Sequence, residues 1–223
     1  MDNVCVSIDH ITVAAATLGD GVAWVEERLG GVRVPVGGAH PVMGTHNHLL
    51  RLGDALFLEI IAPDPAVPNP PRRPRWYALD DAEFLHRLRQ EGPRLATWVA
   101  RTTDIAAAVG RSPIPLGAPE RVGRGGLEWL ITVPSDGALP EGGVMPTLIQ
   151  WPRDRAHPAA GMPDLGFRLL GLELRHPAPD RLDAALDAIG LDRAGILSID
   201  GRPGPASLRA RLAAPSGAIV VLD

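Results

Sequence analysis

The stretch GTHNHLLRLGDALFLEII, residues 44–61, decides the fold of this chain of 223 residues. Two apolar-rich runs, Leu49–Leu52 and Ala55–Ala62, flank the dipeptide Gly53-Asp54. Glycine at the first central position of a two-residue loop is typical of a type II′ turn between antiparallel strands. The stretch therefore predicts a β-hairpin.

The turn also predicts a register for the two strands. Counting outward from Gly53-Asp54 sets His48 directly opposite Glu59, and directly opposed side chains share one face of a sheet. A three-residue loop or a bulge would slide this pairing and separate the two side chains. With the two-residue turn, we expect a histidine and a carboxylate to converge on one face.

Composition is typical of a globular protein of the reducing cytoplasm. Hydrophobic residues make up 45% and charged residues 22%, and no apolar run reaches the ~18 residues of a membrane span. The acidic start of the chain lacks the pattern of a signal peptide. Cys5 is the only cysteine, so neither an intramolecular disulfide nor a thiolate zinc cluster is expected. A net charge of -4 with dispersed arginines argues against nucleic-acid binding.

The chain contains no lysine, because all 22 basic residues are arginine. This excludes Schiff-base chemistry with pyridoxal phosphate and the lysine of a nucleotide-binding P-loop, so neither cofactor is expected. No Gly-x-Ser-x-Gly motif is present, which disfavours a serine nucleophile. Carboxylates, seven histidines and a metal that they would hold remain as the means of catalysis.

A strand, a helix opened by aspartate and three further strands recur three times along the chain. The copies cover residues 1–63, 93–154 and 165–223, and their helices are predicted to open at Asp20, Asp104 and Asp180. A proline-rich segment, Pro63–Trp76, and a helix over Asp81–Gln90 link the first two copies into one paired domain, residues 1–154.

Matching positions of the first two copies suggest a site. His10 and Glu59 occupy the first and last strands of copy one, where Trp98 and Gln150 stand in copy two. Imidazole and carboxylate ligands suit Zn, Ni, Mn or Fe(II), and His48 or Gln150 would complete such a site. The alternative is structural, with His10 hydrogen-bonded in the core and His48 paired with Glu59 across the hairpin.

Three motifs resemble one known family. They are Ile-Asp-His-Ile at residues 8–11, Gly-Ala-His-Pro-Val-Met-Gly-Thr-His-Asn at 38–47 and Leu-Gly-Asp-Ala-Leu-Phe-Leu-Glu-Ile-Ile at 52–61. Together they look like the glyoxalase-like branch of the vicinal oxygen chelate (VOC) superfamily. The resemblance implies an α+β fold in which repeated βαβββ modules form a cup like that of glyoxalase, bleomycin-resistance protein and dihydroxybiphenyl dioxygenase, with a third βαβββ-like module.

The resemblance also implies a function. A divalent metal (Zn, Ni, Mn or Fe) would be held by His10 and Glu59, with His48 or Gln150 added, and Glu59 would also act as the base of a lyase or isomerase. The substrate would be a small molecule with vicinal oxygens. Residues expected to contact it are His40, Asn47, Phe57, Trp98 and Trp151.

Copy two departs from the family pattern, because Trp98 and Gln150 stand where a histidine and a glutamate are often found. A non-catalytic protein that binds or sequesters a small molecule is therefore the alternative function. The odd third copy makes homodimerisation through that copy a further hypothesis.

Overall fold

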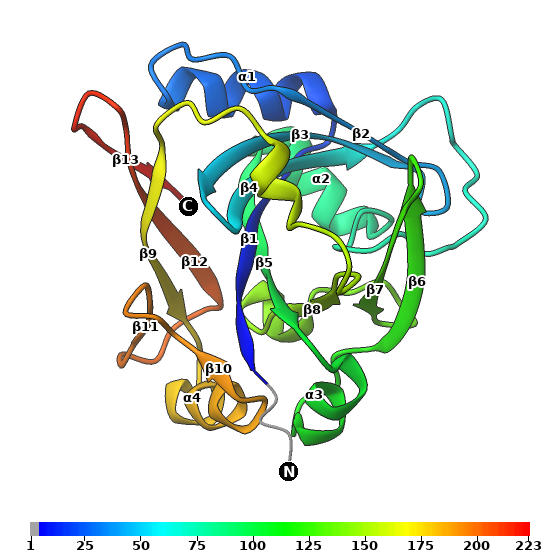
Figure 1. Cartoon of the computed structure of the whole chain (residues 1–223), viewed down its shortest axis with the longest axis vertical. Coiled ribbons are helices and arrows are strands. Elements are labelled where there is room, and N and C mark those ends of the chain that lie inside the picture. Colours follow the sequence, from blue (N-terminus) through cyan, green and yellow to red (C-terminus); the bar gives the residue numbers. More distant parts are fainter. Residues whose placement is uncertain (1–4) are drawn as a thin grey trace.

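The computed structural model describes residues 5–223 as a mixture of helices and strands (Figure 1). The first unit consists of β1 (Val6–Ala14), α1 (Leu18–Arg28), β2 (Val36–His40), β3 (Thr45–Gly53) and β4 (Leu56–Pro63). Helix α2 (Ala82–Gln90) then leads into the second unit, which consists of β5 (Arg94–Thr102), α3 (Ile105–Arg111), β6 (Ala118–Arg124), β7 (Leu127–Val133) and β8 (Thr147–Gln150). Both units have the predicted order of strand, helix and three strands.

The two units form one curled sheet with the strand order β2-β3-β4-β1-β5-β8-β7-β6. In each unit the first strand pairs in parallel with the fourth, and the remaining strands continue antiparallel. Strands β1 and β5 join the units by antiparallel pairing. The sheet curls until its outer strands, β2 and β6, come into contact (Figure 1). The predicted α+β cup of paired βαβββ units is confirmed.

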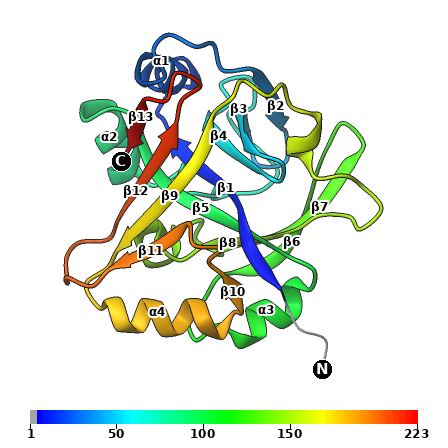
Figure 2. The same ribbon diagram turned by 60° about the vertical axis from the view of Figure 1, so that its left-hand side comes forward.

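The third copy has the predicted elements but a different pairing. It consists of β9 (Arg168–Arg175), α4 (Pro179–Ala188), β10 (Leu191–Asp192), β11 (Leu197–Asp200), β12 (Ser207–Ala213) and β13 (Ile219–Leu222). Four of these strands form a second sheet in the order β11-β9-β12-β13 (Figure 2). The short β10 pairs instead with β1. In this copy the first strand, β9, lies between β11 and β12, whereas in the first two units the first strand pairs with the last strand of its unit. The third copy therefore does not continue the curled sheet.

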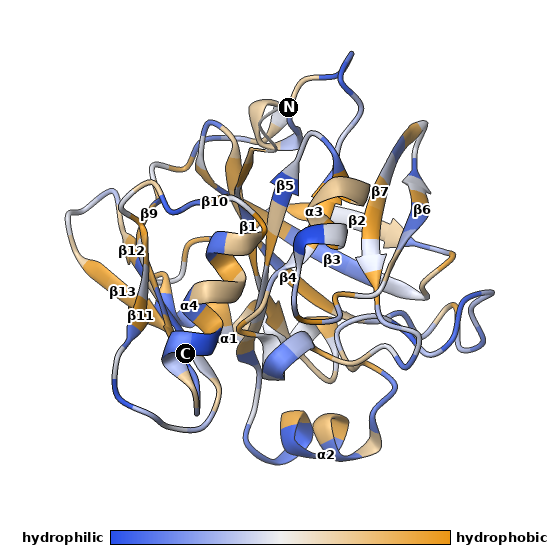
Figure 3. Ribbon diagram, turned by 90° about the horizontal axis from the view of Figure 1, so that it is seen from below, coloured by the Kyte–Doolittle hydropathy of each residue, from blue (hydrophilic) through white to orange (hydrophobic). Residues whose placement is uncertain are grey.

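The main sheet separates two apolar clusters. Ile11, Leu58 and Trp98 belong to the cluster shared with α1, α3 and the third copy. Val99 and Trp129 belong to the cluster on the concave side, which Phe84 of α2 joins. Figure 3 shows that α2 and α4 each carry hydrophobic and hydrophilic residues, as expected of helices with one packed face. Alternate residues of one strand therefore reach different clusters.

The starts of the helices agree only in part with the sequence-based expectation. Asp104 is the N-cap of α3, and Asp81 is the N-cap of α2. The prediction for Asp20 is wrong, because Thr17 caps α1 and Asp20 lies three residues further on, where its amide donates to the Thr17 hydroxyl. The prediction for Asp180 is also wrong, since Ala178 precedes α4. Within residues 5–223, no helix is both long and apolar enough to cross a bilayer.

The predicted register of the hairpin is wrong by one residue. Gly53 pairs with Leu56, and a bulge between Arg51 and Gly53 then shifts the rest of the ladder. As a result Glu59 lies opposite Leu49, and His48 lies opposite Ile60. A shift of one residue exchanges the two faces of a strand. Asn47 and Leu49, instead of His48, share the face of Glu59.

Candidate functional site

The concave side of the cup holds a small cavity between the two units. Its volume is about 40 Å³, little more than the ~30 Å³ that one water molecule occupies in the liquid. The lining is largely aromatic or apolar, with a few ionisable groups among these residues. It comprises His10, His40, Asn47, Leu49, Phe57, Glu59, Trp76, Tyr77, Arg124, Leu127, Trp129, Ile131, Ile149, Trp151 and Pro158.

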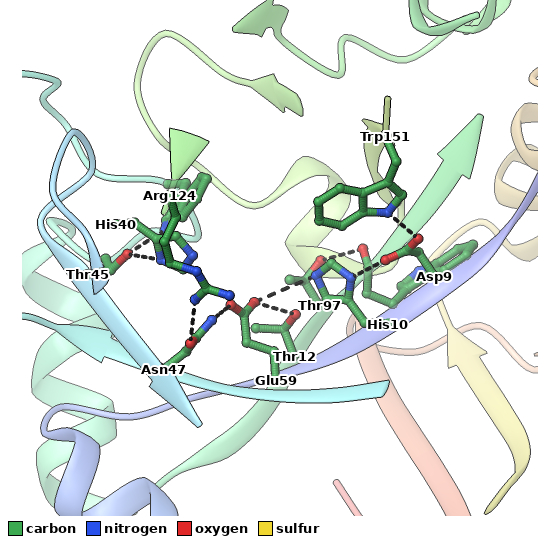
Figure 4. Close-up of polar contacts among 12 residues, drawn as sticks. Asp9, His10, Thr12, His40, Thr45, Asn47, Glu59, Thr97, Arg124 and Trp151 are labelled. Carbon is green, nitrogen blue, oxygen red and sulfur yellow. Dashed lines mark hydrogen bonds and ion pairs between the residues drawn. The ribbon is translucent and has the colours of Figure 1, made fainter. Parts of the chain in front are cut away.

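A bulge in β1 brings two consecutive side chains to the cavity side. The pairing of β1 with β5 shifts between Ile8 and His10, so that two residues of β1 face one of β5. Asp9 Oδ1 consequently lies 2.7 Å from His10 Nδ1 (Figure 4). Both residues are buried, and the His10 ring stacks on Phe57 with 4.4 Å between the ring centroids. The hydrogen bond to Asp9 and the stacking on Phe57 together fix the orientation of the imidazole.

Asp9 is completely buried and is held by three donors. Besides His10, the indole Nε1 of Trp151 donates to Asp9 Oδ2 over 2.8 Å, and His157 Nε2 lies 2.9 Å from the same oxygen. Burial raises the pKa of Asp9, but the hydrogen bonds from His10 and His157 outweigh it, so the pKa lies well below its ordinary value. An ionised carboxylate only accepts hydrogen bonds. His10 therefore donates from Nδ1, which leaves Nε2 as the free nitrogen.

Glu59 lies beside that free nitrogen. Its Oε2 atom is 3.7 Å from His10 Nε2 and accepts a long hydrogen bond of 3.5 Å from the Thr12 hydroxyl. Asn47 Nδ2 donates to the other oxygen, Oε1, over 2.7 Å. The Glu59 side chain is only 7% exposed. Burial of a carboxylate next to an imidazole destabilises the folded state. Ionisable groups in such environments are common at functional sites.

Asn47 connects Glu59 to a cation from the second unit. Its Oδ1 atom accepts from the backbone N–H of Gly38 over 2.8 Å and from Arg124 over 3.2 Å (Figure 4). The close approach depends on two glycines, because a Cβ atom on Gly37 would overlap Asn47 Oδ1 and one on Gly38 would lie 3.0 Å from the Arg124 side chain. The pair Gly37-Gly38 is part of strand β2.

His40 lies at the opposite end of the cavity from Asp9 (Figure 4). Its Nδ1 atom is 3.1 Å from the Thr45 hydroxyl, and its ring meets Trp76 and Trp129 edge to face. Burial, with the charge of Arg124 adding to it, lowers the pKa of His40 to about 3. His40 is therefore neutral at physiological pH.

Six residues that the sequence singled out line this one cavity. They are His10, His40, Asn47, Phe57, Glu59 and Trp151. The cavity brings together the histidine, the carboxylate and the aromatic side chains that a substrate site was expected to contain. Their roles in binding or catalysis remain predictions.

Three other predicted residues do not reach the cavity. His48 faces the other side of the sheet, where its Nδ1 atom bonds to the Val34 carbonyl oxygen over 2.9 Å. Gln150 Oε1 accepts from the backbone N–H of Ile105 at the start of α3. Trp98 is completely buried in the other cluster and donates to the Val144 carbonyl. The structure therefore does not bring His48, Gln150 and Trp98 together with His10 and Glu59.

These errors have a common cause, which is strand alternation. His10 lies opposite Val99 of β5, and Trp98 lies opposite Ile11 on the other face. The residues next to Gln150, Ile149 and Trp151, line the cavity instead. Matching the copies by sequence spacing selected Trp98 and Gln150, whereas the residues next to them point toward the cavity side of the sheet.

The side chains present do not fit a resident divalent metal. His10 and Glu59 are two donors of the right chemistry, but the second unit contributes Val99, Ile149 and Trp151 where further ligands would be needed. Among the residues that the structure describes, no three His, Cys, Asp or Glu side chains are grouped so that they could hold a metal ion. A structural or catalytic metal normally requires three or four protein ligands.

Sequence reasoning missed three groups at the site. Asp9 is the first, although a charged residue within an apolar strand is itself a signal, because such residues are seldom buried without a partner. His157 was given no role because it precedes a proline, and Arg124 lies in a strand that was predicted only weakly. No local pattern indicates that Arg124 reaches the cavity or that His157 reaches Asp9 from a distant segment.

A family model and one solved structure agree with this architecture. The model of a family described as glyoxalase-like domain matches residues 8–190. A hypothetical protein from Staphylococcus aureus has a similar structure, with a TM-score of 0.58 and 14% identity over 97% of this chain and 84% of that one. Methylmalonyl-CoA epimerase from Mycobacterium tuberculosis matches 65% of this chain and 87% of its own, with a TM-score of 0.40 and 20% identity. A search of curated proteins found no match.

Proposed function

The chain belongs to the glyoxalase-like domain family of the VOC superfamily, and from this membership we propose that it is a lyase or isomerase acting on a small substrate with adjacent oxygens. The observation that carries the proposal is the pair His10 and Glu59. Two buried proton-accepting atoms, 3.7 Å apart, open on one cavity. Proton transfer next to a carbonyl group is the chemistry that such a pair can perform.

In the proposed mechanism Glu59 removes a proton from the substrate carbon next to a carbonyl group. The proton passes from Glu59 Oε2 to His10 Nε2, which is free because Nδ1 donates to Asp9. The ionised Asp9 then stabilises the imidazolium, as a buried carboxylate does behind a catalytic histidine. Return of the proton to the neighbouring substrate atom completes an isomerisation, and loss of a leaving group completes an elimination.

The divalent metal expected from the family resemblance has no place in this mechanism. His10 and Glu59 are the only two of the four predicted ligands that meet, and the described residues offer no third acidic, histidine or cysteine ligand. The proton transfer is therefore assigned to the side chains alone.

A second candidate function is non-catalytic binding of an apolar or aromatic molecule. The aromatic and apolar lining favours it, because binding pockets are commonly lined by apolar and aromatic groups with few polar ones. The two candidates differ in one respect: only the enzyme depends on the proton-accepting atoms of both His10 and Glu59.

Exchange of substrate hydrogen with deuterated water tests the proposal. Phenylpyruvate, pyruvate, dihydroxyacetone and methylglyoxal carry adjacent oxygens, and proton NMR would follow exchange at the carbon next to the carbonyl group. We expect the protein to accelerate exchange of at least one of them, and Glu59→Gln and His10→Gln to lose at least ~100-fold of that rate. The matched control is His48→Gln on the other face, which should keep it. Uncatalysed rates with all four probes would overturn the enzyme proposal, and saturable quenching of tryptophan fluorescence without exchange would support the binder.

The remaining predictions concern assembly and location. Homodimerisation through the third copy is proposed on the ground that the sheet β11-β9-β12-β13 presents the exposed residues Leu170, Ile219 and Val221. Light scattering tests it, and a monomeric mass would contradict it. The exposed free thiol of Cys5 accords with the reducing cytoplasm predicted from composition.

A further inference from the structure

The cavity contains hydrogen-bond donors that lack acceptors. Arg124 lies at the end of β6, and the pairing of Val122 with Trp129 and of Arg124 with Leu127 places these four side chains on one face of the β6–β7 hairpin. Three of these residues line the cavity, namely Arg124, Leu127 and Trp129. Trp129 Nε1 is buried without a hydrogen-bond partner. The second unit therefore presents an indole N–H and a guanidinium group to the same space.

Arg124 has no carboxylate partner. Among the described residues, no Asp or Glu oxygen lies within 4.0 Å of its guanidinium group, and the one hydrogen bond it makes goes to the neutral amide oxygen of Asn47. That oxygen already accepts from the backbone N–H of Gly38. A guanidinium group has five N–H donors, so most of those of Arg124 remain available.

The anionic groups of the cavity are already compensated. Asp9 receives hydrogen bonds from His10, Trp151 and His157. Glu59 accepts from the amide nitrogen of Asn47, whose oxygen accepts from Arg124 (Figure 4). A negative group that entered beside Arg124 would meet unused donors.

From this excess of donors we infer that the cavity binds small carboxylates with an apolar or aromatic body, and that Arg124 and Trp129 recognise the carboxylate. The inference rests on the proposed small-molecule site and names the class of its ligand. A bidentate guanidinium–carboxylate pair is the geometry that this side chain favours. Phe57 and Trp151 lie beside the rest of the ligand and face the proton-transfer pair.

The hairpin also supplies a means of entry. Arg124 is followed by two glycines, Gly125 and Gly126, both with positive φ (56° and 81°), at the exposed tip between β6 and β7. The cavity of about 40 Å³ is too small for an aromatic acid, so the ligand must displace part of its lining. Movement of Arg124 from Asn47 to the carboxylate would open the space that the ligand then fills.

A matched pair of probes tests the inference. Phenylacetate and phenylacetamide have nearly the same shape, and only the first is charged. We expect calorimetry to give at least a tenfold tighter dissociation constant for phenylacetate, accompanied by quenching of tryptophan fluorescence. Arg124→Gln should remove this preference while phenylacetamide binding stays the same, and Arg124→Lys should retain part of it. Gly38→Ala should weaken it, because the new Cβ atom crowds the Arg124 side chain.

The control is Arg121→Gln in the same strand, because Arg121 is an exposed arginine paired with Glu128. It should keep the full preference. Equal affinity of the parent protein for the two probes, or a preference that survives Arg124→Gln, would overturn the inference and leave the small-molecule site intact. Failure of both probes to bind the parent protein would overturn the inference together with the small-molecule function. A preference that depends on Arg124, in a protein without proton exchange, would support the anion site and contradict the enzyme proposal.

Discussion

Asp9 and His10 are consecutive residues, and Asp9 Oδ1 lies 2.7 Å from His10 Nδ1 on the cavity side of β1. In a regular strand their side chains would point to opposite faces. The bulge in the β1–β5 pairing removes that separation. A local irregularity of the backbone thus creates the dyad on which the proposed chemistry depends.

The first prediction concerns the tautomer of His10. Asp9→Asn removes the charged acceptor, so the Nδ1–H form of His10 should lose its preference, and nitrogen NMR of the imidazole would detect the change. The free energy of unfolding should fall by about 1–3 kcal/mol, because one of the two buried acceptor oxygens is replaced by an NH2 group that donates. His86, exposed on α2, serves as the internal control. An unchanged His10 spectrum would show that Asp9 does not set the tautomer.

The second prediction concerns stability in acid. The pKa of His40 falls from 6.5 to about 3 in the folded protein, so between these values the unfolded chain binds a proton that the folded chain excludes. Stability is therefore unaffected above about pH 6.5 and is lost as the pH falls toward 3, by an amount on the order of several kcal/mol.

His40→Gln should flatten this pH dependence, although it should also lower stability at pH 7.5. Urea denaturation at pH 7.5, 6, 5 and 4 would measure the effect. Asp9 acts in the same direction at lower pH, because its depressed pKa stabilises the folded state above its ordinary range and the contribution disappears in strong acid. The same slope in the parent protein and in His40→Gln between pH 6.5 and 4 would contradict the assignment.

The third prediction tests the register of the hairpin. Asn47→Ala removes the amide between Glu59 and Arg124 and should cost about 1–3 kcal/mol in the free energy of unfolding. His48→Ala removes one hydrogen bond to the Val34 carbonyl and should cost about 0.5–1.5 kcal/mol. Binding of phenylacetate should weaken only in Asn47→Ala. If His48→Ala abolished binding and Asn47→Ala did not, His48 would face the cavity and the bulged register would be wrong.

The fourth prediction concerns metal content. Protein purified without chelator should contain well under one equivalent of Zn, Ni, Mn and Fe by elemental analysis, because only two suitable side chains converge at His10 and Glu59. Added EDTA should leave the melting temperature unchanged. A full equivalent of metal that is lost in both His10→Ala and Glu59→Gln would contradict this prediction and restore the metal-dependent mechanism.

Periodic patterns in the sequence predicted much of the fold correctly. The paired order of strand, helix and three strands, the helix predicted over Asp81–Gln90 and the helix start at Asp104 all occur in the structure. These features depend on neighbours a few residues apart, whose spacing a sequence records directly. The third copy shows the limit, because its elements were predicted correctly but its strand pairing was not.

The sequence by itself determined the inventory of the site. It contains His10, Glu59, Asn47 and the aromatic residues of the cup, in a chain without lysine. The tertiary structure decided which of them meet. The bulge in β3 places Asn47 instead of His48 on the face of Glu59. The bulge in β1 brings Asp9 to the same side as His10. Closure of the cup then brought in Arg124 and His157 from distant segments. Successive side chains of a strand point to opposite faces of the sheet, so a bulge that adds one residue moves every side chain beyond it to the other face. The position of the bulge is fixed only by the pairing with neighbouring strands.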